Sequence, residues 1–188
     1  MPVTIGAKRE SDFTDPLGML SDCHRRVERF LQALIEVTNQ ARGGSLDTEQ
    51  RIALESGLRY FREAAPKHTA DEEESLFPRL RATGRAGIEQ LLTHIDTLES
   101  DHGSAAEAHS QVEHLARKWL HDGRLTEEDA AELSTQLANL AVLYQRHIHL
   151  EDHEVFPAAS AILTAEDRRA IGEEMAARRG IERDNRLS

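Results

Sequence analysis

Two stretches of the chain share one pattern, HTADEEESLFP at residues 68–78 and HIHLEDHEVFP at residues 147–157. Each begins with a histidine, carries a glutamate four positions later, and ends in Phe-Pro. Residues four apart in an α-helix lie on one face, about 6 Å apart along the axis. A single His-x-x-x-Glu pair is common on solvated helix faces. Two pairs, each followed by Phe-Pro, instead indicate a repeated functional unit.

The residues around these stretches follow the pattern of a helical bundle. Apolar positions recur in alternating steps of three and four, which is typical of the inward seam of a left-handed bundle. Hydrophobic residues make up 39% of the 188 residues and aromatic residues only 4%, a composition that favours helix over strand. We therefore predict four long helices, over about 15–41, 47–80, 87–121 and 126–162, and a short fifth helix that begins near 164.

Capping residues mark several of the expected helix ends. Asp47 with Gln50, and Thr164 with Asp167, have the three-residue spacing by which a side chain caps the first turn of a helix. Pro66 falls inside the second expected helix. A proline removes a backbone donor and crowds the preceding turn, so we expect a bend at this position.

Charge and composition exclude several classes of protein. The formal net charge of −11 argues against a surface that binds nucleic acid. No apolar run approaches the roughly 20 residues that cross a bilayer, and residues 1–14 lack the apolar stretch of a secretory signal. The single cysteine, Cys23, fits a reducing compartment. We expect a cytoplasmic protein with a flexible arm at 1–14, a bundle at 15–162, and a short helix and tail at 163–188.

Histidine interrupts the apolar seam in all four expected helices, and glutamate follows one turn later in two of them. Buried imidazoles and carboxylates without partners cost free energy, and a metal site would satisfy them together. Imidazole with carboxylate suits iron, manganese or zinc, and two bridging carboxylates suit a pair of ions about 3.5–4 Å apart. The candidate metal ligands are His24, His68, Glu72, His102, His109, His147 and Glu151.

Other polar residues fall beside the seam or away from it. Tyr144 lies one turn before His147 in the seam. Its hydroxyl could hydrogen-bond an oxygen bound to the metal, and packing in the seam would explain the residue equally well. Glu73, Glu74 and Asp152 are expected next to the ligands or at the surface. The histidines expected in solvent are His94, His114, His121, His149 and His153.

The two repeated stretches, with SDCHRRVERFL at residues 21–31 and LESDHGSAAEAH at residues 98–109, resemble the hemerythrin-like domain of the cation-binding HHE type. The resemblance covers roughly residues 16–161. It implies an all-α, antiparallel up-down four-helix bundle, here with a short extra C-terminal helix, and a non-haem di-iron centre. His24, His68, His102 and His147 match the four recurrent histidines of the family, and Glu72 and Glu151 match its bridging carboxylates.

The sequence departs from hemerythrins proper on the third helix. Those proteins place two histidines one turn apart, whereas here Ala105 and Ala106 follow His102, and the next seam histidine is His109. His109 is therefore either a ligand or a residue that contacts one. The fourth helix also carries Glu151 where hemerythrins proper have an aspartate one residue later.

The resemblance implies three kinds of function and leaves the choice between them open. The favoured one is reversible binding of O₂, NO or peroxide at two iron ions joined by an oxo or hydroxo bridge, with manganese or zinc as possible substitutes. The second is an enzyme-like role in NO or peroxide detoxification or in repair of iron centres. The third is an iron-dependent sensor or interaction module, with protein partners that the sequence leaves unknown.

Overall fold

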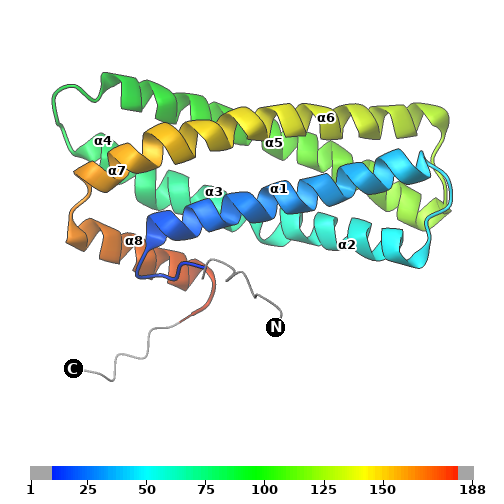
Figure 1. Cartoon of the computed structure of the whole chain (residues 1–188), viewed down its shortest axis with the longest axis horizontal. Coiled ribbons are helices and arrows are strands. Elements are labelled where there is room, and N and C mark those ends of the chain that lie inside the picture. The colour runs from blue at the N-terminus through cyan, green and yellow to red at the C-terminus, as the bar shows by residue number, and fades with distance from the viewer. Residues whose placement is uncertain (1–9, 182–188) are drawn as a thin grey trace, which may run out of the picture.

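The computed structural model describes residues 10–181, which form helices and no strand. Four antiparallel rods lie side by side along one long axis (Figure 1). The second and fourth rods each consist of several consecutive helical segments. In chain order the elements are α1 (Pro16–Ala41), α2 (Thr48–Glu63), α3 (Ala65–Ala70), η1 (Asp71–Leu76), α4 (Phe77–Ala82), α5 (Glu89–Asp122), α6 (Glu127–Leu150), η2 (Glu151–Val155), α7 (Phe156–Ile162) and α8 (Ala165–Arg178).

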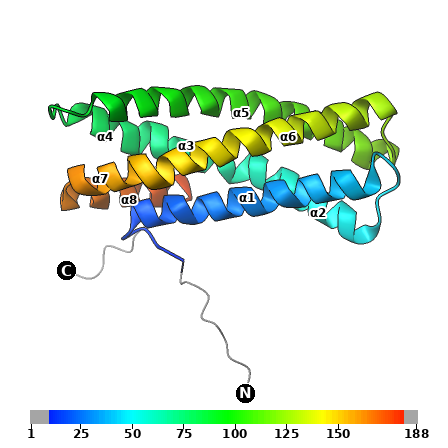
Figure 2. The ribbon, with the colours of Figure 1, turned by 45° about the horizontal axis from the view of Figure 1, so that its top comes forward.

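Each rod packs against the rod that follows it in the chain, and the first rod also contacts the fourth. Helix α1 contacts α2 and α6, and α5 contacts α6 and, more sparsely, α2. The view in Figure 2 shows the same four rods from another side. Short connections between consecutive rods make neighbours antiparallel, as in an up-down bundle. The predicted all-α four-helix bundle with an extra C-terminal helix is confirmed.

The capping residues act as the sequence predicted. The backbone N–H of Gln50 donates to Asp47 Oδ1 at 2.8 Å, and the Gln50 side chain accepts from the Asp47 N–H at 3.0 Å. Thr164 and Asp167 form the same reciprocal pair at the start of α8. The helix is interrupted just before Pro66, where α2 ends at Glu63 and α3 begins at Ala65.

The second and fourth rods each contain a wide π-helical turn that the sequence analysis did not predict. In η1 the N–H of Phe77 donates to the carbonyl of Glu72, five residues earlier, instead of the usual four. In η2 the N–H of Phe156 donates in the same way to the carbonyl of Glu151. Such turns occur as single interruptions of α-helices and are frequent at functional sites.

The Phe-Pro pairs give a physical reason for these wide turns. Pro78 and Pro157 have no N–H to donate, and a proline ring crowds the carbonyl four residues before it. The helix relieves this crowding by widening just before each proline. The repeated Phe-Pro therefore shapes the backbone next to each of the two glutamates.

The apolar core is divided into two clusters by a layer of polar side chains. One cluster surrounds Trp119 and Leu137, near the loops at one end of the bundle. The other surrounds Phe77 and Ile95 and includes Met175 of α8. The buried polar side chains that lie between them include five of the candidate metal ligands on the seam, at 0–7% exposure.

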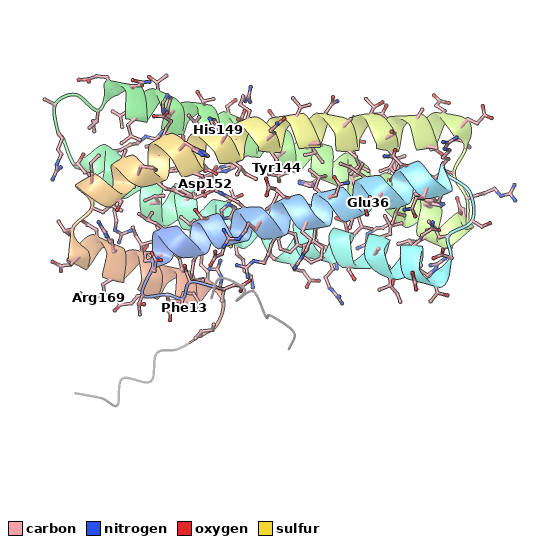
Figure 3. The ribbon with its side chains drawn as sticks, in the orientation of Figure 1. Phe13, Glu36, Tyr144, His149, Asp152 and Arg169 are labelled. Atoms are coloured by element: carbon pink, nitrogen blue, oxygen red, sulfur yellow. The ribbon has the colours of Figure 1, made fainter. Side chains whose placement is uncertain are left out.

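Helix α8 and the segment before α1 pack against the end of the bundle. Phe13 lies beside α8 (Figure 3), and a Cβ atom added to Gly172 would collide with the Phe13 carbonyl oxygen. The N–H of Ser11 donates to Asp22 Oδ2 at 2.6 Å. Residues 10–14 of the expected N-terminal arm are therefore docked. Residues 1–9 and the expected tail from 182 onward lie outside the described range.

Two arginines fix the end of α8 to the π-helical turn η1. Arg179 Nη2 lies 2.6 Å from Asp71 Oδ2, and Arg178 Nη1 lies 2.9 Å from Asp71 Oδ1. Asp71 is fully buried and directly precedes Glu72. Within residues 10–181, no helix combines the length and the apolar character needed to cross a membrane.

Candidate metal centre

Six of the seven predicted ligands meet in the polar layer at the middle of the bundle. Glu72 and Glu151 are fully buried, and the side chain of His102 is 9% exposed. Every rod contributes, so the site exists only in the folded bundle. The six residues are His24 from α1, His68 from α3, Glu72 from η1, His102 from α5, His147 from α6 and Glu151 from η2.

All four imidazoles turn the same ring nitrogen, Nε2, toward the two carboxylates. The Nε2 atoms of His24 and His147 lie 3.0 and 3.3 Å from Glu151 Oε2. The Nε2 atom of His68 lies 3.4 Å from Glu72 Oε1, and that of His102 lies 3.3 Å from Glu72 Oε2. Each glutamate therefore faces two histidines.

The ligand atoms form two overlapping groups, each with two imidazoles and two carboxylates. His24 and His68 belong to one group, and His102 and His147 belong to the other. Glu72 and Glu151 belong to both, and the ligand atoms within each group lie within 4.8 Å of one another. Two carboxylates shared between two histidine pairs are suited to bridging two cations.

Several of these buried atoms lack a hydrogen bond. Among the residues described, both carboxylate oxygens of Glu72 and of Glu151 have no hydrogen-bond partner, and neither do the Nε2 atoms of His24 and His102. A buried polar group without a partner costs about 1–3 kcal/mol, and more when it is charged. Cations between these atoms would satisfy them together. The donor set of imidazole nitrogen and carboxylate oxygen fits iron, manganese or zinc.

The sequence model of the hemerythrin HHE cation-binding domain matches residues 15–159. The chain belongs to this family. An uncharacterized protein of Haemophilus influenzae is similar to it, with 29% identity over 174 residues that cover 90% of this chain and 92% of the relative.

Carboxylates outside the two groups orient the imidazoles of this HHE domain. Asp152 Oδ1 lies 3.1 Å from His24 Nδ1 and also accepts from the Ser21 hydroxyl at 2.6 Å. Glu73 Oε1 lies 2.8 Å from His102 Nδ1. A carboxylate on the far nitrogen fixes ring orientation and makes the near nitrogen a better metal donor. Both residues follow a candidate ligand glutamate directly in the sequence.

Asp101 lies close to a third histidine without a hydrogen bond to it, and sequence reasoning did not single it out. Its Oδ2 lies 3.5 Å from His147 Nδ1, and its Oδ1 accepts from Arg146 at 2.5 Å. Asp101 is three residues after Leu98, a step that places it on the edge of the apolar seam. A buried aspartate next to His102 was the signal that could have identified it.

The HHE site has an approximate internal two-fold relation. The ring of Phe156 stacks on His24, with centroids 5.5 Å apart, and the ring of Phe77 stacks on His102 at 6.4 Å, both with an interplanar angle of 11°. Each phenylalanine comes from the Phe-Pro that follows a candidate ligand glutamate. The two repeated stretches therefore hold the opposite histidines in the same manner.

Burial and close contacts perturb the ionisation of the site residues. Burial alone would lower the pKa of His24, but the carboxylates of Asp152 and Glu151 outweigh it and raise this pKa to about 10. Burial and the neighbouring Glu151 raise the pKa of Glu72 well above its usual value. Burial and the charge of His24 lower the pKa of His68 well below its usual value. A proton on His24 or on Glu72 offsets part of the negative charge of the two buried carboxylates.

The seventh predicted ligand, His109, lies outside both groups of the HHE site within the described part of the chain. Its Nε2 is 2.9 Å from the hydroxyl of Tyr144, and its ring stacks on Phe61 with centroids 4.1 Å apart. Burial lowers the pKa of His109 to about 4, so the ring is neutral at pH 7. No other histidine of residues 10–181 joins the groups, and four of the five expected in solvent are exposed, with His94 half-buried.

Proposed function

We propose that this HHE domain holds two iron ions and binds a small diatomic or peroxide ligand there. The observation that carries the proposal is the sharing of Glu72 and Glu151 between two pairs of histidines. Two carboxylates that face two cations offset their charge and hold them close together. Membership of a cation-binding family supports the same assignment. Manganese and zinc are accommodated by the same donor types.

The residues of the chain would hold and shield the metal pair. The four imidazoles would donate through Nε2, and Asp152 and Glu73 would keep two of them oriented. The apolar cluster around Phe77 and Ile95 would limit access of water from one end of the bundle. The iron pair would supply a redox-active centre that can take O₂, NO or peroxide.

Metal analysis of the protein from an iron-replete host tests this proposal. We expect close to two metal ions per chain, mainly iron, and an optical spectrum that changes on addition of O₂ or NO. Glu151→Ala should lower the metal content, while His114→Ala on the exposed surface of α5 should leave it unchanged. A reproducible content of one ion or none would refute the paired site. Rapid consumption of peroxide by the iron form would favour the enzyme-like role.

A sensor function is the second candidate, and the contacts of Asp71 favour it. Asp71 directly precedes Glu72 and is bound by Arg178 and Arg179 at the C-terminal end of α8, within the segment 163–188 that we propose as an addition to the bundle domain 15–162. A shift of η1 on metal loss would reach α8 through these two ion pairs. Limited proteolysis tests this idea. Cleavage within α8 should be faster without metal, and equal rates would contradict a sensor built on this helix.

A further inference from the structure

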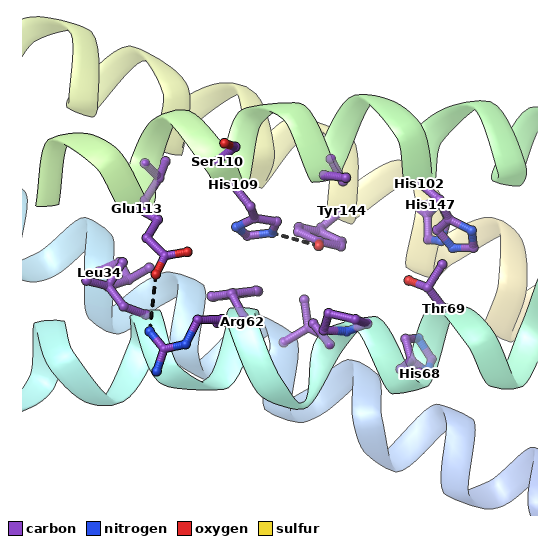
Figure 4. A pocket seen from close by; sticks show the side chains of 18 of the residues that line it. Leu34, Arg62, His68, Thr69, His102, His109, Ser110, Glu113, Tyr144 and His147 are labelled. Carbon is purple, nitrogen blue, oxygen red and sulfur yellow. Dashed lines mark hydrogen bonds and ion pairs between the residues drawn. The ribbon is translucent and has the colours of Figure 1, made fainter. Parts of the chain in front are cut away.

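A cavity of about 350 Å³ extends from the histidines of the metal site along the interior of the bundle. It runs between α2 and α3 on one side and α5 on the other, past His109 and Tyr144 to Arg62 and Glu113 (Figure 4). Helices α2 and α5 pack only sparsely, and the small residues Ala65 and Ala105 line the space between them. The cavity thus begins at the candidate metal centre and continues well beyond it.

The size of the cavity exceeds what O₂, NO or peroxide requires. Sites for small organic molecules start at about 300 Å³ and are lined mainly by hydrophobic side chains with a few polar groups. The walls between His109 and the exposed end come mostly from Leu34, Leu58, Phe61 and Val112, which are at most 8% exposed. Volume and lining together match a small organic ligand rather than a diatomic gas.

The charged groups of the lining exclude a charged ligand. Apart from the metal-site histidines, the charged residues that line the cavity are Arg62 and Glu113. They pair with each other at 3.1 Å where they are partly exposed, and Glu113 also binds Arg117 at 2.7 Å. An ion in the apolar part of the cavity would lose its hydration without gaining an opposite charge, which is costly. The cavity therefore favours a neutral molecule.

One polar pair lies between the exposed end of the cavity and the metal site. Tyr144 and His109 share a hydrogen bond of 2.9 Å, and both line the cavity. If the tyrosine donates to Nε2, the Nδ1–H of the neutral imidazole remains as a donor. If Nε2–H donates to the tyrosine, the phenolic hydrogen remains instead. In either tautomer, the pair keeps one donor for a hydroxyl or carbonyl oxygen of a third molecule.

From these observations we propose that the cavity binds a small, neutral, mainly apolar organic molecule whose single oxygen group is held by His109 and Tyr144. The cavity that would hold this molecule also reaches His102 and His147 of the candidate metal site. The inference adds a ligand class to the proposed function. It does not depend on iron, because neither His109 nor Tyr144 belongs to the two ligand groups.

Four probes of matched size test the proposal by calorimetry and by ligand-observed NMR, on both metal-free and iron-loaded protein. Benzyl alcohol should bind with a dissociation constant below about 1 mM, a reasonable value for a ligand of this size. Toluene should bind several-fold more weakly, because it leaves the donor of the polar pair unused. Benzoate and benzylammonium should bind at least ten-fold more weakly than benzyl alcohol.

Two substitutions locate the bound probe. Tyr144→Phe keeps the shape of the cavity and should lower the affinity for benzyl alcohol about five-fold, the value of one hydrogen bond, without changing that for toluene. Ala105→Leu adds bulk to the cavity wall and should abolish binding of both. Ala138→Leu, on the exposed face of α6, is the matched control and should bind both normally. Circular dichroism verifies that each variant is folded.

The proposal is overturned if benzyl alcohol fails to bind the folded wild-type protein. It is also overturned if Ala105→Leu binds as tightly as the control, which would place the probe elsewhere, or if benzoate binds as well as benzyl alcohol. Metal analysis of the same samples separates the two hypotheses. If the protein holds its full iron content but binds no probe, only the proposed cavity ligand is refuted. If it binds the probe but holds no metal, only the proposed di-iron function is refuted.

Discussion

Removal of the metal should lower the melting temperature of the protein by more than ten degrees. Six buried ligand atoms, on Glu72, Glu151, His24 and His102, lack hydrogen-bond partners within residues 10–181. At about 1–3 kcal/mol each, they represent a penalty comparable to the whole stability of a domain, about 5–15 kcal/mol. Relaxation of the metal-free fold and protonation of its polar groups reduce this penalty. If about 5 kcal/mol of it remains, the melting temperature falls by about 10–20 °C, because 1 kcal/mol shifts the melting temperature of a domain of this size by about 2–4 °C.

This difference in melting temperature should shrink as the pH falls. The pKa of His24 is raised to about 10 in the metal-free fold, so its protonated form stabilises that fold fully below about pH 6.5 and progressively less up to pH 10. The raised pKa of Glu72 acts in the same direction, since the metal-free fold loses stability as this carboxyl ionises. Metal must displace both protons, and acid therefore favours the metal-free form.

Differential scanning calorimetry of metal-free and metal-loaded protein at pH 6 and pH 8 measures both effects. The metal content of each sample is verified before and after the scan. Equal melting temperatures at pH 8 would refute the reasoning, because the polar layer would then be satisfied without any ion. A difference that grows toward pH 6 would show that the direction of the proton linkage is wrong.

Four substitutions test other parts of the structure. Glu72→Ala should lower metal content strongly, whereas His149→Ala, on an exposed position of α6, should leave it at the wild-type level in the same elemental analysis. Asp152→Asn should weaken metal affinity about 10–100-fold in a chelator competition, because the imidazole it orients loses its carboxylate partner. Gly172→Ala should cost about 1–3 kcal/mol in urea unfolding, since its Cβ collides with the docked segment 10–14, and an unchanged midpoint would contradict that packing.

The sequence was most informative where the helical repeat of apolar residues determines both the packing of the bundle and the direction of the site histidines. The seam that buries apolar residues also points His24, His68, His102 and His147 inward, so helical phase alone brings them together. Capping pairs such as Asp47 with Gln50 could be predicted because both partners lie within one turn of the chain. These features depend on local geometry that is the same in every α-helix.

Features that depend on contacts between rods could not be predicted in the same way. Asp101 lies near His147, a residue 46 positions away on another helix, and its place beside His102 at the edge of the seam does not specify that contact. His109 fits the seam of its helix as well as His102 does. Its interaction with Tyr144 depends on how α5 and α6 are rotated against each other, which periodicity does not specify.

The π-helical turns have a consequence for any attempt to transplant or redesign this site. A wide turn is what an α-helix forms when one residue is inserted without shifting the segments on either side. Copying the six ligands onto four ideal helices would leave Phe77 and Phe156 rotated by about 100° from the imidazoles they now stack on. Deleting one residue between Glu72 and Phe77 should have the same effect in the natural chain, while a deletion in the loop 83–88 should be tolerated. The number of residues between each glutamate and the following proline therefore determines the geometry of the site, as the identity of the candidate ligands does.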